Sequence, residues 1–327
     1  MISVIIPFFN SDQTLKECLD SVFSNKFENY EVITVSDKST DNSINIVKNY
    51  NCKIIELDEN KGPAFARNTG ANSASGEVLF FLDSDCILKN DALTNIDRIF
   101  KKKITNVVQG IYSHEPNYNN LATQYQQSFY CYYSFSKYLT HTNCLISMCF
   151  AIEKKIFIES KGFNTSIKNA TAEDEEFGHV LIGNGNKILI ARELTVEHRV
   201  NYSLTKFIKR SFIMYVDTIR SFIRNRTYTN KVKQKNYFNV LAGMPILGLI
   251  ILLLPIIIFF PSSTNMYFFL TLNIFFLLLH IRFINFIKKS KGLSQASKII
   301  PICYLDTLLM LCGTLYGFFI YFLGKRY

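Results

Sequence analysis

The segment Val78-Leu79-Phe80-Phe81-Leu82-Asp83-Ser84-Asp85 is a short run of large apolar residues that ends on two acids. An apolar run without polar alternation is typical of a strand that is buried on both faces of a sheet. Strands and helices alternate ahead of it: we predict strands at 2–9, 30–36 and 53–57, and helices at 14–25, 44–50 and 63–74. This alternation predicts an α/β fold with a doubly wound, mostly parallel sheet.

Polar residues stand where the predicted strands end. Asn10 follows the first strand, Asp37 follows the second, and Asp83 and Asp85 follow the fourth. Because ligands of open parallel sheets bind beyond the carboxyl ends of the strands, we expect these residues to meet in one crevice. Asp83 and Asp85 are one residue apart and can reach the same cation. Their oxygen atoms suit Mg²⁺ or Mn²⁺, which completes its coordination with substrate phosphates. A helix cap is the other interpretation of this pair.

Two nucleotide-binding motifs are absent from the sequence. No G-x-G-x-x-G follows the first predicted strand, and no G-x-x-x-x-G-K-[ST] occurs anywhere. A dinucleotide-dependent oxidoreductase and a P-loop NTPase are therefore disfavoured.

The charge of the chain is unevenly distributed. The 327 residues carry a net charge of +10, but residues 1–200 hold 20 Lys/Arg and 24 Asp/Glu, whereas residues 201–327 hold 16 Lys/Arg and two acids. A nucleic-acid-binding protein with a uniform basic surface would not divide in this way, so we expect no nucleic-acid partner.

The basic part also contains three apolar runs, at about 240–260, 266–286 and 299–323. Because ~20 apolar residues suffice to cross a bilayer as a helix, we predict two or three membrane spans rather than buried core helices. The sequence then divides into a cytoplasmic domain at 1–200, a basic amphipathic juxtamembrane segment at 201–237 and a membrane region at 238–327. The amphipathic helix at 203–224 is expected to lie on an anionic leaflet or to pack on the first domain.

Lys and Arg residues predict the orientation of these spans. They cluster before the first run and between the second and third, and the loop at 261–265 has none. The positive-inside rule therefore places residues 1–235 and 287–298 in the cytoplasm of a multi-pass protein of the inner (plasma) membrane. None of the runs reads as a cleavable signal peptide. Lys325 and Arg326 would lie outside after three spans, which leaves a two-span or re-entrant arrangement open.

Several motifs, in their order and spacing, resemble family 2 glycosyltransferases of the GT-A fold. They are SVIIPFFN at 3–10, DKSTD at 37–41, NKGP at 60–63, ARNTG at 66–70 and FLDSD at 81–85, followed by GFN at 162–164, ED at 173–174 and VEH at 196–198. The resemblance covers about residues 1–200. One departure is Lys38, which stands where a glycine is usual.

The resemblance implies a role for each matching residue. The residues that would bind the nucleotide-sugar are Pro7, Asn10, Asp37, Arg67, Asp83 and Ser84. Of these, Asp37 would hold the base, Arg67 would lie near the base or the diphosphate, and Asp83 would meet the ribose or the metal. Asp85 would bind the metal directly, with His198 as a third ligand.

The resemblance also makes Asp174 the general base. Direct displacement at an anomeric carbon needs a carboxylate that takes the proton of the acceptor hydroxyl, and this single step inverts the configuration. A set of solvated acids at a helix start is the other interpretation of residues 173–176.

We therefore expect a metal-dependent, inverting glycosyltransferase of cell-envelope glycan synthesis, with a lipid-linked saccharide or glycolipid as acceptor. The chain has no tryptophan, so the Q-x-x-R-W motif of processive synthases is absent and transfer of one sugar at a time is favoured. One alternative is transfer to polyprenyl phosphate. Another is a catalytically idle membrane scaffold that binds nucleotide-sugars.

Overall fold

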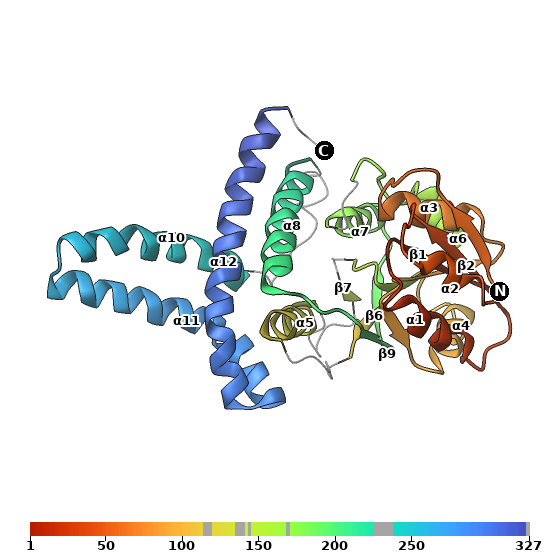
Figure 1. The fold of residues 1–327 in the computed structure, drawn as a ribbon, viewed down its shortest axis with the longest axis horizontal. Helices are drawn as coiled ribbons and strands as arrows, with labels where there is room; N and C mark the ends of the chain where they lie inside the picture. Colours follow the sequence, from red (N-terminus) through yellow and green to blue (C-terminus); the bar gives the residue numbers. More distant parts are fainter. Residues whose placement is uncertain (114–119, 135–140, 143–144, 168–170, 225–237, 325–327) are drawn as a thin grey trace.

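The computed structural model describes residues 1–113, 120–134, 141–142, 145–167, 171–224 and 238–324. The strands gather on one side of the molecule, and the longest helices lie on the other (Figure 1). Some of the basic residues that precede the first predicted span, such as Lys231 and Lys233, lie outside the described residues, as do Lys325 and Arg326.

One half of the sheet is parallel, as predicted. Its strand order is β3-β2-β1-β4. The bounds are Ile2–Phe8 for β1, Tyr30–Ser36 for β2, Lys53–Glu56 for β3 and Val78–Leu82 for β4. The predicted strands at 30–36 and 78–82 match residue for residue, and the other two end one residue earlier than predicted. All four carboxyl ends therefore open on the same edge.

The other half contains most of the antiparallel pairing, so the sheet combines the predicted parallel strands with antiparallel ones. After β4 the order continues β8-β6-β9-β5, and β7 pairs with β9. These strands are β5 (Cys86–Leu88), β6 (Val107–Tyr112), β7 (His141–Thr142), β8 (Cys149–Glu153) and β9 (Ile188–His198). β8 runs antiparallel to both β4 and β6, and β5 runs antiparallel to β9. Antiparallel neighbours, unlike parallel ones, can pair without a helical crossover connection.

Helices cover both faces of the sheet. One face packs against α1 (Leu15–Phe23), α2 (Ser43–Val47) and α4 (Ala92–Lys101). The other face packs against α3 (Pro63–Asn72), α6 (Lys154–Glu159) and α7 (Glu173–Gly183). Neighbouring residues of β1 point to opposite faces, so Val4 and Ile6 join the first core and Ile5 joins the second. This arrangement confirms the predicted doubly wound α/β fold.

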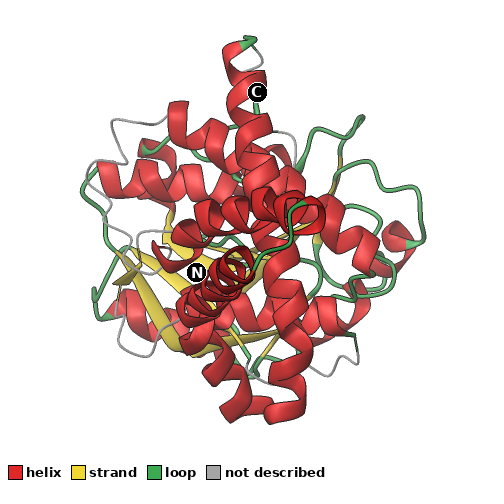
Figure 2. Cartoon of the chain, turned by 90° about the vertical axis from the view of Figure 1, so that its left-hand side faces the viewer, coloured by secondary structure: helices red, strands yellow, loops and turns green. Residues whose placement is uncertain are grey.

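Three helices are long and apolar enough to cross a membrane: α10 (Phe238–Phe259), α11 (Ser263–Lys291) and α12 (Leu293–Phe322). α10 and α11 project as a hairpin from the rest of the molecule (Figure 1), and α12 lies against both. Seen from the tip of this hairpin, helices stand in front of much of the sheet (Figure 2).

α8 (Leu204–Arg224) and α5 (Leu121–Ser134) connect these three long apolar helices to the sheet domain. α8 packs closely along α12, because glycines of α12 leave room for its backbone. A Cβ atom on Gly313 would lie 3.0 Å from the carbonyl oxygen of Phe212, and one on Gly317 would lie 2.9 Å from that of Val216. The predicted amphipathic helix is therefore present, and its close partner is α12.

Candidate active site

The site begins at Asp37, which directly follows β2 and contacts the residues just before α3. Asp37 is buried, and its two carboxylate oxygens accept hydrogen bonds from the backbone N–H groups of Lys61 (2.7 Å) and Gly62 (2.9 Å). Gly62 has a φ of 88°, a left-handed conformation that glycine adopts without strain, and Pro63 then starts the helix. Asp37 thus fixes the position of the first turn of α3.

Arg67, one turn further along α3, joins the two halves of the site. Its Nη2 donates to Asp83 Oδ1 (2.8 Å) at the end of β4, and its Nη1 donates to Glu173 Oε1 (3.0 Å) at the start of α7. The side chain is 4% exposed and lies over the ring of Phe163. A buried guanidinium is tolerated because carboxylates on both sides offset its desolvation.

Asp85 and His198 meet because β5 pairs with β9. The antiparallel register places Cys86 opposite His198, and the imidazole Nε2 lies 3.2 Å from Asp85 Oδ2. The imidazole also stacks on the ring of Tyr112, with centroids 5.0 Å apart. Burial opposes ionisation of Asp85, but His198 and Arg210 bring the pKa of this carboxyl below its usual range.

The donor set at the end of β4 suits a hard divalent cation. The side chains of Asp83 and Asp85 are 31% and 34% exposed, and each uses one oxygen for its ion pair. Two carboxylates fit Mg²⁺ or Mn²⁺ when substrate phosphates supply further oxygens. Within the described ranges, however, no three His, Cys, Asp or Glu side chains gather closely enough to hold a metal ion. The predicted triad with His198 is therefore not assembled, because Asp83 turns to Arg67.

The other predicted nucleotide-sugar residues tie neighbouring strand ends together. Asn10 Oδ1 accepts a hydrogen bond from the backbone N–H of Thr40 (2.8 Å), and Ser84 Oγ donates to the hydroxyl of Ser11 (2.9 Å). Pro7 is buried within β1. Lys38 has a φ of 63°, which explains physically why a glycine suits this position.

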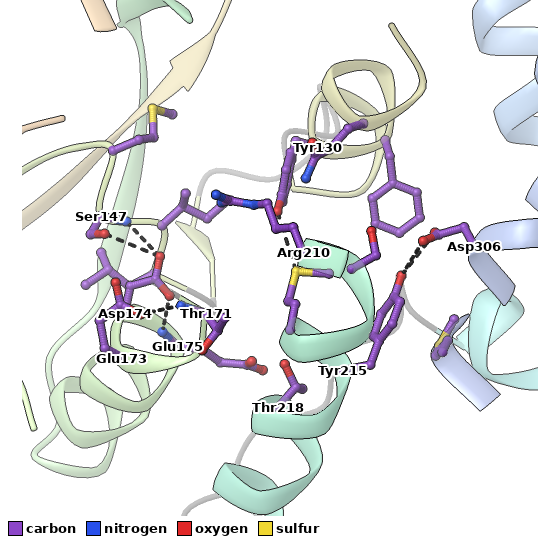
Figure 3. Close-up of a pocket in the computed structure, with 18 of the residues that line it drawn as sticks. Tyr130, Ser147, Thr171, Glu173, Asp174, Glu175, Arg210, Tyr215, Thr218 and Asp306 are labelled. Atoms are coloured by element: carbon purple, nitrogen blue, oxygen red, sulfur yellow. Dashed lines mark hydrogen bonds between the residues drawn. The ribbon is translucent and has the colours of Figure 1, made fainter. Parts of the chain in front are cut away.

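Asp174 is held firmly at the start of α7. Its Oδ2 accepts hydrogen bonds from the backbone N–H (3.1 Å) and hydroxyl (3.4 Å) of Ser147, and its Oδ1 accepts one from the N–H of Glu175 (2.8 Å) (Figure 3). Burial raises the pKa of Asp174 despite these bonds. Burial also raises the pKa of Glu175 to about 7 and, together with Asp174, raises that of Glu173.

A cavity of about 580 Å³ runs past these groups to the membrane helices. Arg67, Asp83, Asp174 and His198 line it. Five predicted residues are not among its lining residues: Pro7, Asn10, Asp37, Ser84 and Asp85. The structure therefore brings the predicted base to the same cavity as Asp83 and His198, whereas the remaining strand-end residues do not line it.

Four further side chains that carry no motif in the sequence also line the cavity: Glu175, His179, Arg210 and Asp306. Glu175 was one of four consecutive acids, and Arg210 was one of many basic residues on an amphipathic helix. Glu175 and His179 are four residues apart on α7, which places them on the same face of the helix. This spacing is the one feature of the sequence that could have indicated that these two side chains lie together.

Residues 3–160 match the family described as Glycosyl transferase family 2. An α/β sheet that ends on Asp83 and Asp85 and faces Asp174 across a cavity is the arrangement expected of a GT-A-like transferase. Residues 3–160 are therefore similar to a family 2 glycosyltransferase domain.

Known proteins resemble it in sequence and in structure. The chain is 37% identical over 117 residues to the poly(ribitol-phosphate) beta-glucosyltransferase of Bacillus spizizenii, which covers 33% of this chain and 18% of that protein. The mannosyltransferase PcManGT of Pyrobaculum calidifontis, in complex with GDP-Man and Mn²⁺, has a TM-score of 0.59 at 15% identity, over 99% of this chain and 87% of that one. TarS 1–349 of S. aureus has a TM-score of 0.51 at 17% identity, over 99% and 92%.

The sequence matches are partial, since the curated relatives are covered over 15–39% of their own length. The structural likenesses extend over nearly the whole chain and show the fold.

Replacement of Glu175 by glutamine should change how stability depends on pH. A glutamate with an ordinary pKa of 4.5 in the unfolded chain and about 7 in the folded one favours folding at low pH, and this contribution is lost as the pH rises from 4.5 to 7. Glu175→Gln removes that titration. We expect its thermal midpoint to exceed that of the wild type by about 2–4 °C at pH 8, and the difference to shrink toward pH 4.5.

Thermal unfolding of the detergent-purified full-length protein at several pH values measures this difference. Glu159→Gln, an exposed glutamate on α6, is the matched control and should show no such trend. A Glu175→Gln midpoint that differs from the wild type equally at every pH would contradict the assignment.

Proposed function

We propose that the chain is a membrane-anchored, inverting glycosyltransferase that moves one sugar from a nucleotide-diphosphate sugar to a hydroxyl of a lipid-linked saccharide or glycolipid. It would act in cell-envelope glycan synthesis. The observation that carries this proposal is the single cavity, because it joins Asp83 at the end of β4, Asp174 on α7 and the helices that are long enough to span a membrane.

The donor would bind along the strand ends. Asn10, Asp37 and Ser84 would border the nucleotide, and Asp83 and Asp85 would hold Mg²⁺ or Mn²⁺ beside the diphosphate. The complex of PcManGT, a protein of the same fold, with GDP-Man and Mn²⁺ supports a nucleotide-sugar donor and a divalent cation. Arg210 adds a second cation at this side, since it extends from α8 into the cavity between Tyr130 and the pair of Ser147 and Asp174 (Figure 3). A buried guanidinium suits the negative charge of a diphosphate.

Asp174 would act as the general base. The acceptor oxygen forms a bond to the anomeric carbon, the bond from that carbon to the diphosphate oxygen breaks, and the hydroxyl proton passes to an oxygen of Asp174. A bound divalent cation would neutralise the charge that develops on the departing nucleoside diphosphate. Ser147 and the backbone of Glu175 keep the carboxylate oriented, and its raised pKa makes it a better proton acceptor.

The proposed membrane is the plasma membrane, with the catalytic domain on the cytoplasmic side. Lys288, Lys289 and Lys291 in the last turn of α11 support this orientation, since basic residues favour the cytoplasmic ends of spans. The cavity would then open close to the inner leaflet, where a lipid-linked acceptor resides.

Asp174→Asn should bind the donor normally and lose transfer. An amide keeps the size of the side chain but cannot take a proton, so we expect turnover to fall by about 10²–10⁴-fold with little change in donor affinity. Isothermal titration with nucleotide-sugar and a radiolabel transfer assay measure the two effects separately. Asp91→Asn, at an exposed site before α4, is the matched control. Turnover within twofold of the wild type would exclude Asp174 as the base.

Asp85→Ala should weaken nucleotide binding only when a divalent cation is present. Thermal stabilisation by a panel of nucleoside diphosphates, with Mn²⁺ and with chelator, gives the readout. In the wild type we expect one diphosphate to stabilise the protein with Mn²⁺ and to do so far less with chelator. The variant should resemble the chelated wild type in both conditions, and Asp91→Ala should not. Stabilisation that is indifferent to chelator would count against the metal site.

A further inference from the structure

Two side chains on α7 line the cavity without a part in the proposed chemistry. Glu175 and His179 are four residues apart, so they lie on the same face of the helix. His179 is 6% exposed, and its Nδ1 has no hydrogen-bond partner among the described residues. Among the residues that the structure describes, no Lys or Arg forms an ion pair with the carboxylate of Glu175. A buried imidazole nitrogen without a partner is costly, which points to a ligand that bonds to the side chain of His179.

The carboxylate of the next residue, Glu176, has its partners within the protein. Its carboxylate accepts a hydrogen bond from Asn164 Nδ2 (2.6 Å) and pairs with Arg224 and Ser221 of α8. These contacts hold α7 against α8. Glu175 and His179 thus line the cavity. Glu176 instead holds α7 at its distance from α8.

The far wall of this space is polar near α7 and apolar toward the membrane helices. Thr218 of α8 lies in the cavity on the side of Glu175 (Figure 3). Beyond it, the lining residues are large and apolar: Met214, Ile219 and Phe222 of α8, Met244 of α10 and Met310 of α12. A ligand that fills the whole cavity must therefore combine a polar head with a hydrocarbon chain.

The charge of the lining decides which kind of head fits. Five carboxyl groups line the cavity, at Asp83, Glu173, Asp174, Glu175 and Asp306, against two guanidinium groups among the described residues. Arg67 is already engaged by Asp83 and Glu173. Arg210 lies over the ring of Tyr202 and near Asp85, at the side assigned to the donor. A phosphate placed beside Glu175 would therefore have no cation beside it, among the described residues, to offset its desolvation.

At the membrane end, Asp306 is already bonded within the protein. Its carboxylate accepts hydrogen bonds from the hydroxyls of Tyr125 (2.8 Å) and Tyr215 (3.0 Å), which come from α5 and α8. It therefore joins α5, α8 and α12 in the wall of the cavity. As a carboxyl group, it would not attract a phosphate head group.

We propose that Glu175 and His179 form the acceptor subsite and bind the hydroxyls of a lipid whose head group is uncharged at that point. This inference rests on the proposed function and narrows its acceptor to a neutral, hydroxyl-bearing lipid. A hydroxyl donates to the Glu175 carboxylate, and the imidazole of His179 exchanges a hydrogen bond with a neighbouring hydroxyl. Burial lowers the pKa of His179, so its imidazole is neutral and can serve in either direction.

The test compares acceptors with the full-length protein in phosphatidylcholine vesicles. One set of vesicles contains neutral lipids, namely diacylglycerol, monohexosyl diacylglycerol and polyprenol, and the other contains polyprenyl phosphate. Transfer of radiolabelled sugar is measured from the nucleotide-sugar that binds. The variants are Glu175→Met and His179→Leu, which remove the hydrogen-bonding atoms and roughly keep the size of each side chain, and Glu159→Met is the exposed control.

We expect transfer to a neutral lipid and none to polyprenyl phosphate. Each variant should raise the acceptor KM about tenfold, the effect of ~1.4 kcal/mol from one lost hydrogen bond, with the donor KM unchanged. Three results would overturn the inference. They are a preference for polyprenyl phosphate, an unchanged acceptor KM in both variants, and transfer to none of these lipids by a protein that binds its donor. Failure of the folded wild type to bind any nucleotide-sugar would instead overturn the proposed function.

Discussion

The double ion pair of Arg67 is the interaction on which the site depends. The Arg67 side chain, which is 4% exposed, can remain buried only because Asp83 and Glu173 each pair with one of its Nη atoms. Asp83 belongs to the strand end that would hold the donor, and Glu173 precedes the proposed base directly. One side chain of α3 therefore sets the spacing between the donor end of the sheet and Asp174, although these elements are far apart in sequence.

The second half of the site comes from outside the family 2 domain. α8 supplies Arg210 and Thr218, and α12 supplies Asp306, so the cavity is closed by helices beyond residue 160. Gly313 and Gly317 let α8 approach α12, and Tyr125 and Tyr215 anchor Asp306. A fragment that ends with the sheet would lack the acceptor wall, which physically links the proposed chemistry to the membrane.

The sequence predicts the parallel half of the fold well, because buried strands and amphipathic helices leave clear local patterns. β2 and β4 match their predicted bounds, and the acids at the strand ends fall where the sheet topology requires. The antiparallel half depends on pairings between distant segments, such as β5 with β9, which no local pattern reveals. For the same reason the contact of His198 with Asp85 followed from the family resemblance alone, and Glu175 and His179 were not singled out.

The configuration of the first-formed sugar product tests the proposed chemistry most directly. Hydrolysis of an α-linked nucleotide-sugar uses water as the acceptor, so it needs no knowledge of the lipid. Proton NMR at early times, before mutarotation, distinguishes the anomers. Single displacement with Asp174 as the base predicts that the β-anomer forms first and that Asp174→Asn abolishes its formation. An α-anomer as the first product would contradict direct displacement in this cavity.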